Sequence, residues 1–376
     1  MKKKLLALCY RPPEPGNAQN SQGQYFILQS AQKFFDIQIL SFNPTAYSKD
    51  SNSFFIAIFS KIAKIVKLIL LGRSPRLSHY WDKNFFNSYQ KILNEFKPDY
   101  LYIDHILMMQ YPLKLFPKSK IWLYNEESQL YIKKYKLRKN LIELVKNYRL
   151  DYFEKKSLYH SDKTFFITRE ESSYVENLGF NSVKTMPYAI DDKYFSYNWN
   201  PNQETFSLLF IGDYSHQPNK EAANLICKKL YPAIKNLQIK IILVGRNLDK
   251  IKKYLNTEIT SYENVEDVRK FYRECTLFVA PIFSGAGMRI KILEAASCGI
   301  PVLMTPLANL GVNMENSKEA FIEKDISGMI KSIRKIYASD RTDLVNVSIN
   351  ANNKVKLQFG LSKMNRLYEE VFSDLS

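Results

Sequence analysis

Short apolar runs alternate with helix-length segments along the whole chain, and this rhythm constrains the fold more than any other feature. In the first half, runs of strand length lie at residues 5–9, 37–40, 100–103, 121–124, 164–167 and 183–186. Runs that are bounded by turn residues and separated by helices are typical of parallel sheets covered on both faces. We therefore expect an α/β fold.

The rhythm restarts after the polar segment at residues 198–203, with runs at residues 207–211, 240–244, 277–280 and 301–304. A length of 376 residues exceeds the roughly 250–300 at which a single core usually divides. The pattern predicts two Rossmann-like domains, at residues 1–198 and 205–357. A last segment at residues 358–376 contains an amphipathic helical pattern, which could pack on its own domain or cross back to the first.

The chain is strongly basic. Lys and Arg outnumber Asp and Glu by 54 to 37, which gives a net charge of +17. Such a charge favours polyanionic partners, namely nucleic acid, anionic lipid or phosphorylated small molecules. Because the basic composition is spread along the chain, charge alone selects none of these partners.

The four cysteines, Cys9, Cys227, Cys275 and Cys298, lie far apart in apolar contexts and show no paired spacing. We expect them to be reduced core residues of a cytoplasmic protein. The apolar run before Pro12 is shorter than the roughly 7–15 residues of a signal-peptide core, so it predicts a first buried strand instead.

One segment, at residues 54–71, suggests a membrane surface. Lys61, Lys64 and Lys67 recur every third residue on one face of an otherwise apolar helical pattern. Three lysines inside a bilayer would each cost roughly 2.5–3.5 kcal/mol, so the segment is not expected to span a membrane. It fits a helix lying on an anionic membrane, which would make the protein peripheral to the inner membrane face. An ordinary domain helix with a solvated lysine edge fits equally well.

The main candidate site follows the run at residues 277–280, in the sequence SGAGMRIKILEAASCGIP. In parallel sheets, ligands bind where loops leave the carboxyl ends of strands. Gly285 and Gly287 allow backbone N–H groups to turn towards a ligand, and the next helix presents its positive end there. Arg289 and Lys291 fall in the first turn of that helix, where a basic side chain is unfavourable unless an anion is bound.

This conflict predicts a phosphate site. Glu294, one turn further along, is placed to accept hydrogen bonds from sugar hydroxyls next to the phosphates. The other residues expected to line the phosphate are Ser284, Ala286 and Met288.

Further turns are expected at the same sheet edge. Gly212, after the run at 207–211, permits close approach to a ligand, and His216 in the same turn could contact phosphates. Gly245 and Arg246 follow the next run, and the loop around Val265 could meet a nucleobase through its backbone.

In the first half, Asp104 and His105 follow the run at residues 100–103. If the sheet is parallel, both lie at its carboxyl edge. His105 could orient a hydroxyl group of a bound ligand, although a histidine after a strand is commonly only a satisfied loop residue.

Several segments together resemble one family, the "group 1" sugar transferases, or glycosyltransferase family 4, of the two-domain GT-B fold. The segments in the second half are FIGDYSHQPNKEA (210–222), VGR (244–246), VEDV (265–268), VAPIFSGAGMRIKILEA (279–295) and GIPV (299–302). A looser similarity in the first half covers YNEES (124–128), YFEKKS (152–157), FITREE (166–171) and MPYAID (186–191).

The resemblance implies that the C-terminal domain binds a nucleotide-diphosphate sugar and that the N-terminal domain holds a saccharide or lipid-linked acceptor. It also implies retention of configuration, no metal or other cofactor, a role in cell-surface polysaccharide or glycan synthesis, and a C-terminal helix that returns to the first domain. By position, Glu294 matches the glutamate that holds the donor ribose. Arg289 and Lys291 match the basic pair of a subgroup.

The chain departs from the family pattern in three ways. Ala286 stands where a second glutamate is common, and the usual Arg and Lys after the first strand of the C-terminal domain are missing. Neutralisation of the diphosphate would therefore fall to Arg289 and Lys291. The N-terminal glycine-rich loop is reduced to Gly16 and Gly23. The residues expected on the acceptor side are Gly16, Asn17, Asp104, Asn125 and Glu126.

Three other classes compete with a transferase. A nucleotide-sugar epimerase of the same architecture would need more acids and bases around the donor sugar than Glu294. A noncatalytic nucleotide-binding module would explain Ala286. A nucleic-acid-binding protein rests on charge alone, and nucleic acid is not expected as a partner.

Overall fold

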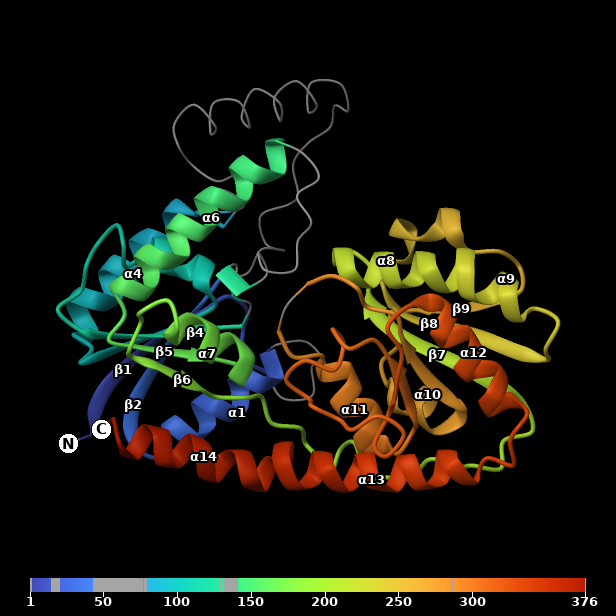
Figure 1. The fold of residues 1–376 in the computed structure, drawn as a ribbon. Coiled ribbons are helices and arrows are strands. Elements are labelled where there is room, and N and C mark those ends of the chain that lie inside the picture. Colours follow the sequence, from blue (N-terminus) through green and yellow to red (C-terminus); the bar gives the residue numbers. More distant parts are fainter. Residues whose placement is uncertain are drawn as a thin grey trace. The chain divides into compact units, whose positions relative to one another are not determined.

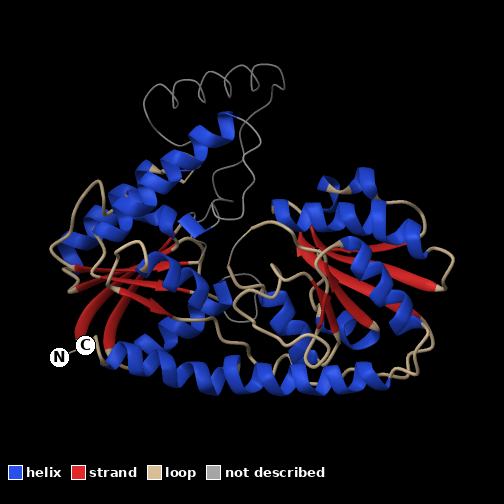
Figure 2. Ribbon diagram, viewed as in Figure 1, coloured by secondary structure: helices blue, strands red, loops and turns tan. Residues whose placement is uncertain are grey.

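The computed structural model describes residues 2–14, 21–42, 77, 80–126, 128, 130–131, 141–285 and 287–375. Of residues 21 and 141–149, only the backbone is described. The chain forms two compact units, one of Met1–Pro187 with Asn365–Ser376, the other of Tyr188–Met364. Each unit contains a parallel six-stranded sheet with helices on both faces (Figures 1 and 2).

The first sheet has the strand order β2-β1-β3-β4-β5-β6. Its strands are β1 (Lys3–Cys9), β2 (Phe35–Ser41), β3 (Tyr100–Asp104), β4 (Lys120–Asn125), β5 (Lys163–Phe166) and β6 (Val183–Thr185). Its helices are α1 (Ser21–Ala31), α4 (Lys83–Phe96), η2 (Ile106–Gln110), α6 (Leu141–Tyr159) and α7 (Arg169–Glu176). The chain leaves β1 for β2 on one side and then passes to β3 on the other, so the topological switch point lies between β1 and β3.

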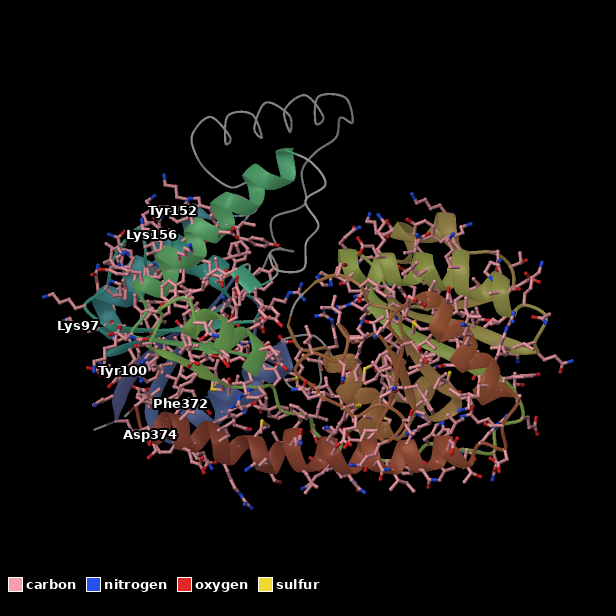
Figure 3. The ribbon with its side chains drawn as sticks, viewed as in Figure 1. Lys97, Tyr100, Tyr152, Lys156, Phe372 and Asp374 are labelled. Atoms are coloured by element: carbon pink, nitrogen blue, oxygen red, sulfur yellow. The ribbon has the colours of Figure 1, made fainter. Side chains whose placement is uncertain are left out.

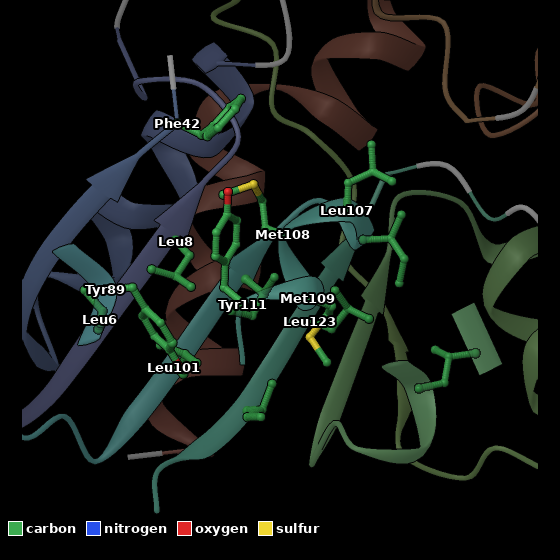
Figure 4. Packing of buried hydrophobic residues seen from close by; sticks show 14 of the residues in the cluster. Leu6, Leu8, Phe42, Tyr89, Leu101, Leu107, Met108, Met109, Tyr111 and Leu123 are labelled. Carbon is green, nitrogen blue, oxygen red and sulfur yellow. The ribbon is translucent and has the colours of Figure 1, made fainter. Parts of the chain in front are cut away.

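Alternation along these strands divides the core of the first unit between two faces. Leu6, Leu8 and Leu101 belong to a cluster with Tyr89 of α4 and Met109 of η2 (Figure 4). On the other face, Trp122 of β4 and Phe35 of β2 each lie 6.2 Å, between ring centroids, from Phe372. Phe372 belongs to the last helix, α14 (Leu361–Ser373), and is labelled in Figure 3.

The second sheet has the order β12-β11-β10-β7-β8-β9. Its strands are β7 (Phe206–Asp213), β8 (Ile239–Arg246), β9 (Ile259–Glu263), β10 (Leu277–Ala280), β11 (Val302–Met304) and β12 (Phe321–Ile322). Its helices are α8 (Gln217–Leu225), the π-helix η3 (Ile226–Leu230), α9 (Tyr231–Ile234), η4 (Leu248–Lys250), η5 (Lys252–Tyr254), α10 (Arg269–Glu274), α11 (Ile290–Cys298), α12 (Ile326–Tyr337) and α13 (Thr342–Phe359). Here the switch point lies between β7 and β10.

The predicted α/β fold with two parallel sheets is confirmed, and each predicted apolar run lies in or overlaps a strand. The return of the C-terminal helix is also confirmed, because Asn365–Ser376 belong to the first unit. The boundaries between the two units lie near residues 188 and 364, whereas the sequence predicted boundaries near residues 200 and 358. Strands β9 and β12 were not predicted.

Three further expectations bear on the surface and core. The four cysteines are buried and form no disulfide, as predicted. Within the described ranges, no helix is both long and apolar enough to cross a membrane. The segment at residues 54–71, with Lys61, Lys64 and Lys67, lies outside the described residues, as do Gly16 and Asn17.

Candidate functional site

The carboxyl edge of the second sheet is built around two adjacent glycines, Gly212 of β7 and Gly245 of β8, which are paired in register. A Cβ atom on Gly245 would lie 1.7 Å from the carbonyl oxygen of Gly212. A Cβ atom on Gly212 would lie 2.9 Å from the side chain of Asn219 and 3.0 Å from Lys291 Nζ. Glycine is therefore required where the strands meet and where two polar side chains cover the end of β7.

Lys291, the second residue of α11, reaches across to the turn after β7. Its Nζ donates to Asn219 Oδ1 at 2.7 Å and lies 4.6 Å from the centroid of the Phe210 ring. Asn219 Nδ2 in turn donates to the carbonyl of Asp213 at 2.9 Å. Burial, with the nearby charge of Arg289, lowers the pKa of Lys291 to about 7. An anion beside Lys291 would restore its positive charge.

Glu294 lies one turn further along α11 and is 4% exposed. Tyr272 of α10 donates its hydroxyl to Glu294 Oε2 at 3.1 Å. The other oxygen, Oε1, has no hydrogen-bond donor in the described part of the chain. Burial raises the pKa of Glu294 to about 7. A buried carboxylate oxygen without a donor is unfavourable, and the hydroxyls of a bound sugar would supply one.

The sequence predicted Arg289 in the first turn of α11. Arg289 instead occupies the N-cap position, one residue before that helix begins. Its guanidinium folds back on the loop, donating to the carbonyls of Gly287 at 2.9 Å and of Ser284 at 3.3 Å. Gly285 and Gly287 both have positive φ, 92° and 77°, a region that favours glycine. Arg289 thus fixes the loop in front of the helix N-terminus.

The same loop contacts helix α8. Ser284 Oγ donates to Glu221 Oε2 at 2.5 Å, and a Cβ atom on Gly285 would lie 3.0 Å from Pro218 Cγ. Met288 is buried, and Ala286 lies outside the described residues.

The remaining predicted donor residues lie at the same edge. Gly245 accepts a hydrogen bond from the backbone N–H of Asn264 at 2.9 Å, which holds the loop containing the half-buried Val265 against β8. Arg246 ends β8 with an exposed side chain, and the exposed His216 is the N-cap residue of α8. The structure therefore brings the predicted turns together around the switch point of the second sheet.

The predicted acceptor-side residues of the first unit also lie at a carboxyl edge. Asp104 ends β3, His105 follows it, and Asn125 ends β4 with Glu126 after it. Asp104, Asn125 and Glu126 are buried. These residues lie beside the switch point of the first sheet.

Sequence reasoning missed two buried carboxylates that shape the loop after β4. Glu154 of α6 accepts hydrogen bonds from Asn125 Nδ2, Ser128 Oγ and the N–H of Leu130, at 2.8–2.9 Å. Glu171 of α7 accepts from the N–H of Ser128 at 3.0 Å. Thr168 Oγ1 also accepts from the N–H of Glu171 and donates to Glu171 Oε2, and this Thr-x-x-Glu spacing, typical of a helix start, is visible in the sequence.

Two partners in the second unit were missed as well. Asn219 holds Lys291 and Tyr272 holds Glu294, and both contacts join elements that are far apart in the sequence. Across the described ranges, no three His, Cys, Asp or Glu side chains form a group that could hold a metal ion.

Comparison with known proteins adds three findings. Residues 205–339 match the family described as Glycosyl transferases group 1. The chain is 21% identical over 225 residues to an uncharacterized 44.6 kDa protein in the cps region of Klebsiella pneumoniae. That match covers 56% of each protein, so the chain spans about half the length of this curated relative.

Solved structures match over nearly the whole chain. Sucrose-phosphate synthase from Thermosynechococcus elongatus has a TM-score of 0.73 at 14% identity, and Anabaena HepE in complex with UDP-glucose has 0.68 at 12%. Both matches cover 99% of this chain and 99% of the other. This likeness confirms the predicted GT-B fold.

Proposed function

Residues 205–339 match the group 1 glycosyl transferases, and from this premise we propose that the chain is a sugar transferase of that family. It moves a sugar from a nucleotide-diphosphate donor, bound by the second unit, to a saccharide or lipid-linked saccharide acceptor, bound by the first. The observation that carries this proposal is the pair Lys291 and Glu294 of α11: Lys291 reaches the glycine turn after β7, and one turn further along Glu294 keeps a buried oxygen without a donor in the described residues.

Glu294 is the ribose-binding group in this proposal. Its Oε1 lacks a donor in the described residues while Oε2 is held by Tyr272, so a ribose hydroxyl would complete the hydrogen bonding of the carboxylate. A donor hydrogen bond to the ionised form lowers the carboxyl pKa, so binding would favour the carboxylate. The complex of Anabaena HepE with UDP-glucose supports a nucleotide sugar as the donor class.

Lys291 and Arg289 serve the diphosphate. Glycosyl transfer passes through an oxocarbenium-like state while negative charge develops on the departing diphosphate. Fixed positive groups and N–H dipoles aimed at that charge stabilise the transition state. Lys291 exchanges Asn219 for a phosphate oxygen, while Arg289 and the backbone N–H groups of the Gly285–Gly287 loop surround the leaving group.

The acceptor binds at the carboxyl edge of the first sheet, where His105 orients a sugar hydroxyl. We further propose that configuration is retained, that no metal ion or other cofactor takes part, and that the product belongs to a cell-surface polysaccharide or glycan. The match to a protein in a cps region supports this last assignment.

A thermal-shift panel tests the donor site. UDP, GDP, ADP and CMP, with and without sugars attached, are added to the wild type, to Arg289→Ala and to Lys331→Met, a control that changes an exposed lysine of α12. A ligand at about 100 times its Kd should stabilise the native state by roughly 2.7 kcal/mol. We expect one base to stabilise the wild type and the control but not Arg289→Ala.

The outcomes separate the candidate functions. No shift with any nucleotide would contradict the donor site. A shift without turnover of the donor sugar in any acceptor mixture would indicate a noncatalytic binding module instead.

A further inference from the structure

An acidic side chain of helix α8 contacts the donor loop, residues 284–287, which the proposed function places around the diphosphate. Glu221 Oε2 accepts a hydrogen bond from the hydroxyl of Ser284, the first residue of this loop, at 2.5 Å. A Cβ atom on Gly285 would lie 3.0 Å from Pro218 Cγ, so the loop packs closely on the same end of α8. Glu221 therefore lies directly beside the donor loop.

The hydrogen bonds of Glu221 leave it able to accept more. Within the described residues each oxygen accepts one hydrogen bond, Oε1 from Gln217 Nε2 at 2.8 Å and Oε2 from Ser284. An ionised carboxylate has about four acceptor positions. No Lys or Arg side chain in the described ranges forms an ion pair with Glu221, which is half-buried. Its partners are thus two neutral donors, and it can still accept from hydroxyl groups of a ligand.

Two other carboxylates at this sheet edge have different roles. Asp213 Oδ1 accepts from the backbone N–H and the hydroxyl of Ser215 and from Asn247 Nδ2, at 2.6–2.9 Å. These contacts hold the turn after β7. Glu294 is assigned to the ribose. Glu221 is the carboxylate that contacts the donor loop itself.

Ser284 joins Glu221 to Arg289. The guanidinium of Arg289 donates to the carbonyl of Ser284 at 3.3 Å, while the hydroxyl of Ser284 donates to Glu221. Phosphate oxygens are attracted by arginine and repelled by glutamate, whereas the hydroxyls of a sugar can donate to a carboxylate. In a nucleotide sugar the sugar ring is joined directly to the diphosphate, so the two parts of the donor can meet the two ends of this connection.

We propose that Glu221 binds hydroxyl groups of the donor sugar and selects a neutral sugar over an acidic one. This inference rests on the proposed function, in which the donor loop and Arg289 surround the diphosphate. A hydroxyl that donates to a charged acceptor makes a stronger hydrogen bond than one that donates to a neutral acceptor. The carboxylate of a uronic acid instead brings a second negative charge next to Glu221, and the two charges repel each other.

Calorimetric titration tests the contact with the sugar. UDP, GDP and ADP are compared with UDP-glucose, GDP-mannose and ADP-glucose on the wild type and on Glu221→Gln, which keeps the shape of the side chain but removes its charge. The control is Glu204→Gln, at an exposed position before β7 and therefore at the opposite edge of the sheet. We expect Glu221→Gln to weaken the sugar nucleotide roughly fivefold or more and the matching nucleoside diphosphate less than about twofold, with no change in the control. Equal losses for the two ligands would show that Glu221 only fixes the loop, and would overturn the proposal.

An acidic sugar tests the selectivity. UDP-glucuronic acid differs from UDP-glucose only in having a carboxylate in place of one hydroxymethyl group, and GDP-mannuronic acid differs from GDP-mannose in the same way. We expect the wild type to bind the neutral form roughly tenfold more tightly or better, and Glu221→Gln to reduce this preference about fivefold. Ser284→Ala removes the hydroxyl but keeps the carboxylate, so its preference should stay within about twofold of the wild type. An unchanged preference in Glu221→Gln would refute the selection.

The results also separate this inference from the proposed function. If no nucleotide binds the wild type, the proposed function fails, and Glu221 has no donor sugar to select. If nucleotides bind but Glu221→Gln leaves the ratio between the Kd values of the nucleoside diphosphate and the sugar nucleotide unchanged, only the role of Glu221 fails. Thermal unfolding of each variant checks that it is folded before titration.

Discussion

Among single residues, Glu294 shows most directly how a binding group can lower stability. Burial raises its pKa from 4.5 to about 7, so the folded protein favours the neutral acid. The stability that this form contributes is complete below pH 4.5 and is lost as the pH rises through about 7.

Glu294→Gln cannot ionise, so it should escape this loss. We expect its free energy of unfolding to equal that of the wild type near pH 4.5 and to exceed it at pH 8 by up to roughly 3 kcal/mol. Donor turnover should fall at least tenfold at both values. Denaturant unfolding across this pH range checks the first point, and a difference independent of pH would contradict it.

Lys291 should discriminate between parts of the donor. Because its Nζ lies at the turn expected to hold phosphate, Lys291→Met should weaken a nucleoside diphosphate at least tenfold and the matching nucleoside by less than twofold. Calorimetric titration of both ligands measures this, with Lys331→Met as the control. Equal losses for the two ligands would remove Lys291 from the phosphate site.

Gly245 offers a test of backbone packing. An added Cβ would meet the carbonyl oxygen of Gly212 at 1.7 Å, whereas one on Gly179, at φ 93°, would meet nothing within 4 Å. Gly179→Ala should cost only about 1–2 kcal/mol, from its left-handed backbone. Gly245→Ala should lower Tm far more, because β7 and β8 must separate. Similar Tm values for the two variants would contradict the close approach.

At the scale of elements, the last helix stabilises the first unit. Phe372 is fully buried against Phe35 and Trp122. Phe372→Ala should therefore cost roughly 3–5 kcal/mol and change the fluorescence of Trp122. Leu357→Ala, at a position that is 74% exposed on α13, should cost less than about 0.5 kcal/mol. Unfolding followed by fluorescence and circular dichroism compares the two.

The strands also show which sequence patterns are enough to predict an element. Fully buried strands such as β3 and β10 were predicted because their residues are apolar, apart from Asp104 at the end of β3. β9 is half exposed and β12 has two residues, so neither produces an apolar run. Strand order alone was enough to place Gly212, Gly245, Lys291 and Glu294 at the carboxyl edge of the second sheet. Asn219 and Tyr272 could not, because their partners lie 72 and 22 residues away.

For the whole molecule, the net charge of +17 raises the question whether the protein binds an anionic membrane surface. Lys61, Lys64 and Lys67 lie outside the described residues, while exposed Lys156 and Tyr152 lie on α6 (Figure 3). We expect the triple change of Lys61, Lys64 and Lys67 to Gln to release the protein from anionic vesicles at low salt, and Lys156→Gln to have little effect. Unchanged sedimentation of the triple variant would refute this assignment.

The division of the chain between its units also affects its synthesis. The residues of the second unit, Tyr188–Met364, form one uninterrupted stretch, whereas the first unit needs Asn365–Ser376 to cover a face of its sheet. Domains generally fold in order as they leave the ribosome. Here the strands of the first sheet are made early, yet Phe35 and Trp122 gain their cover from Phe372 only after the whole of Tyr188–Met364 has been synthesised. The nascent first unit, rather than the second, is therefore the part that chaperones would have to protect for longest.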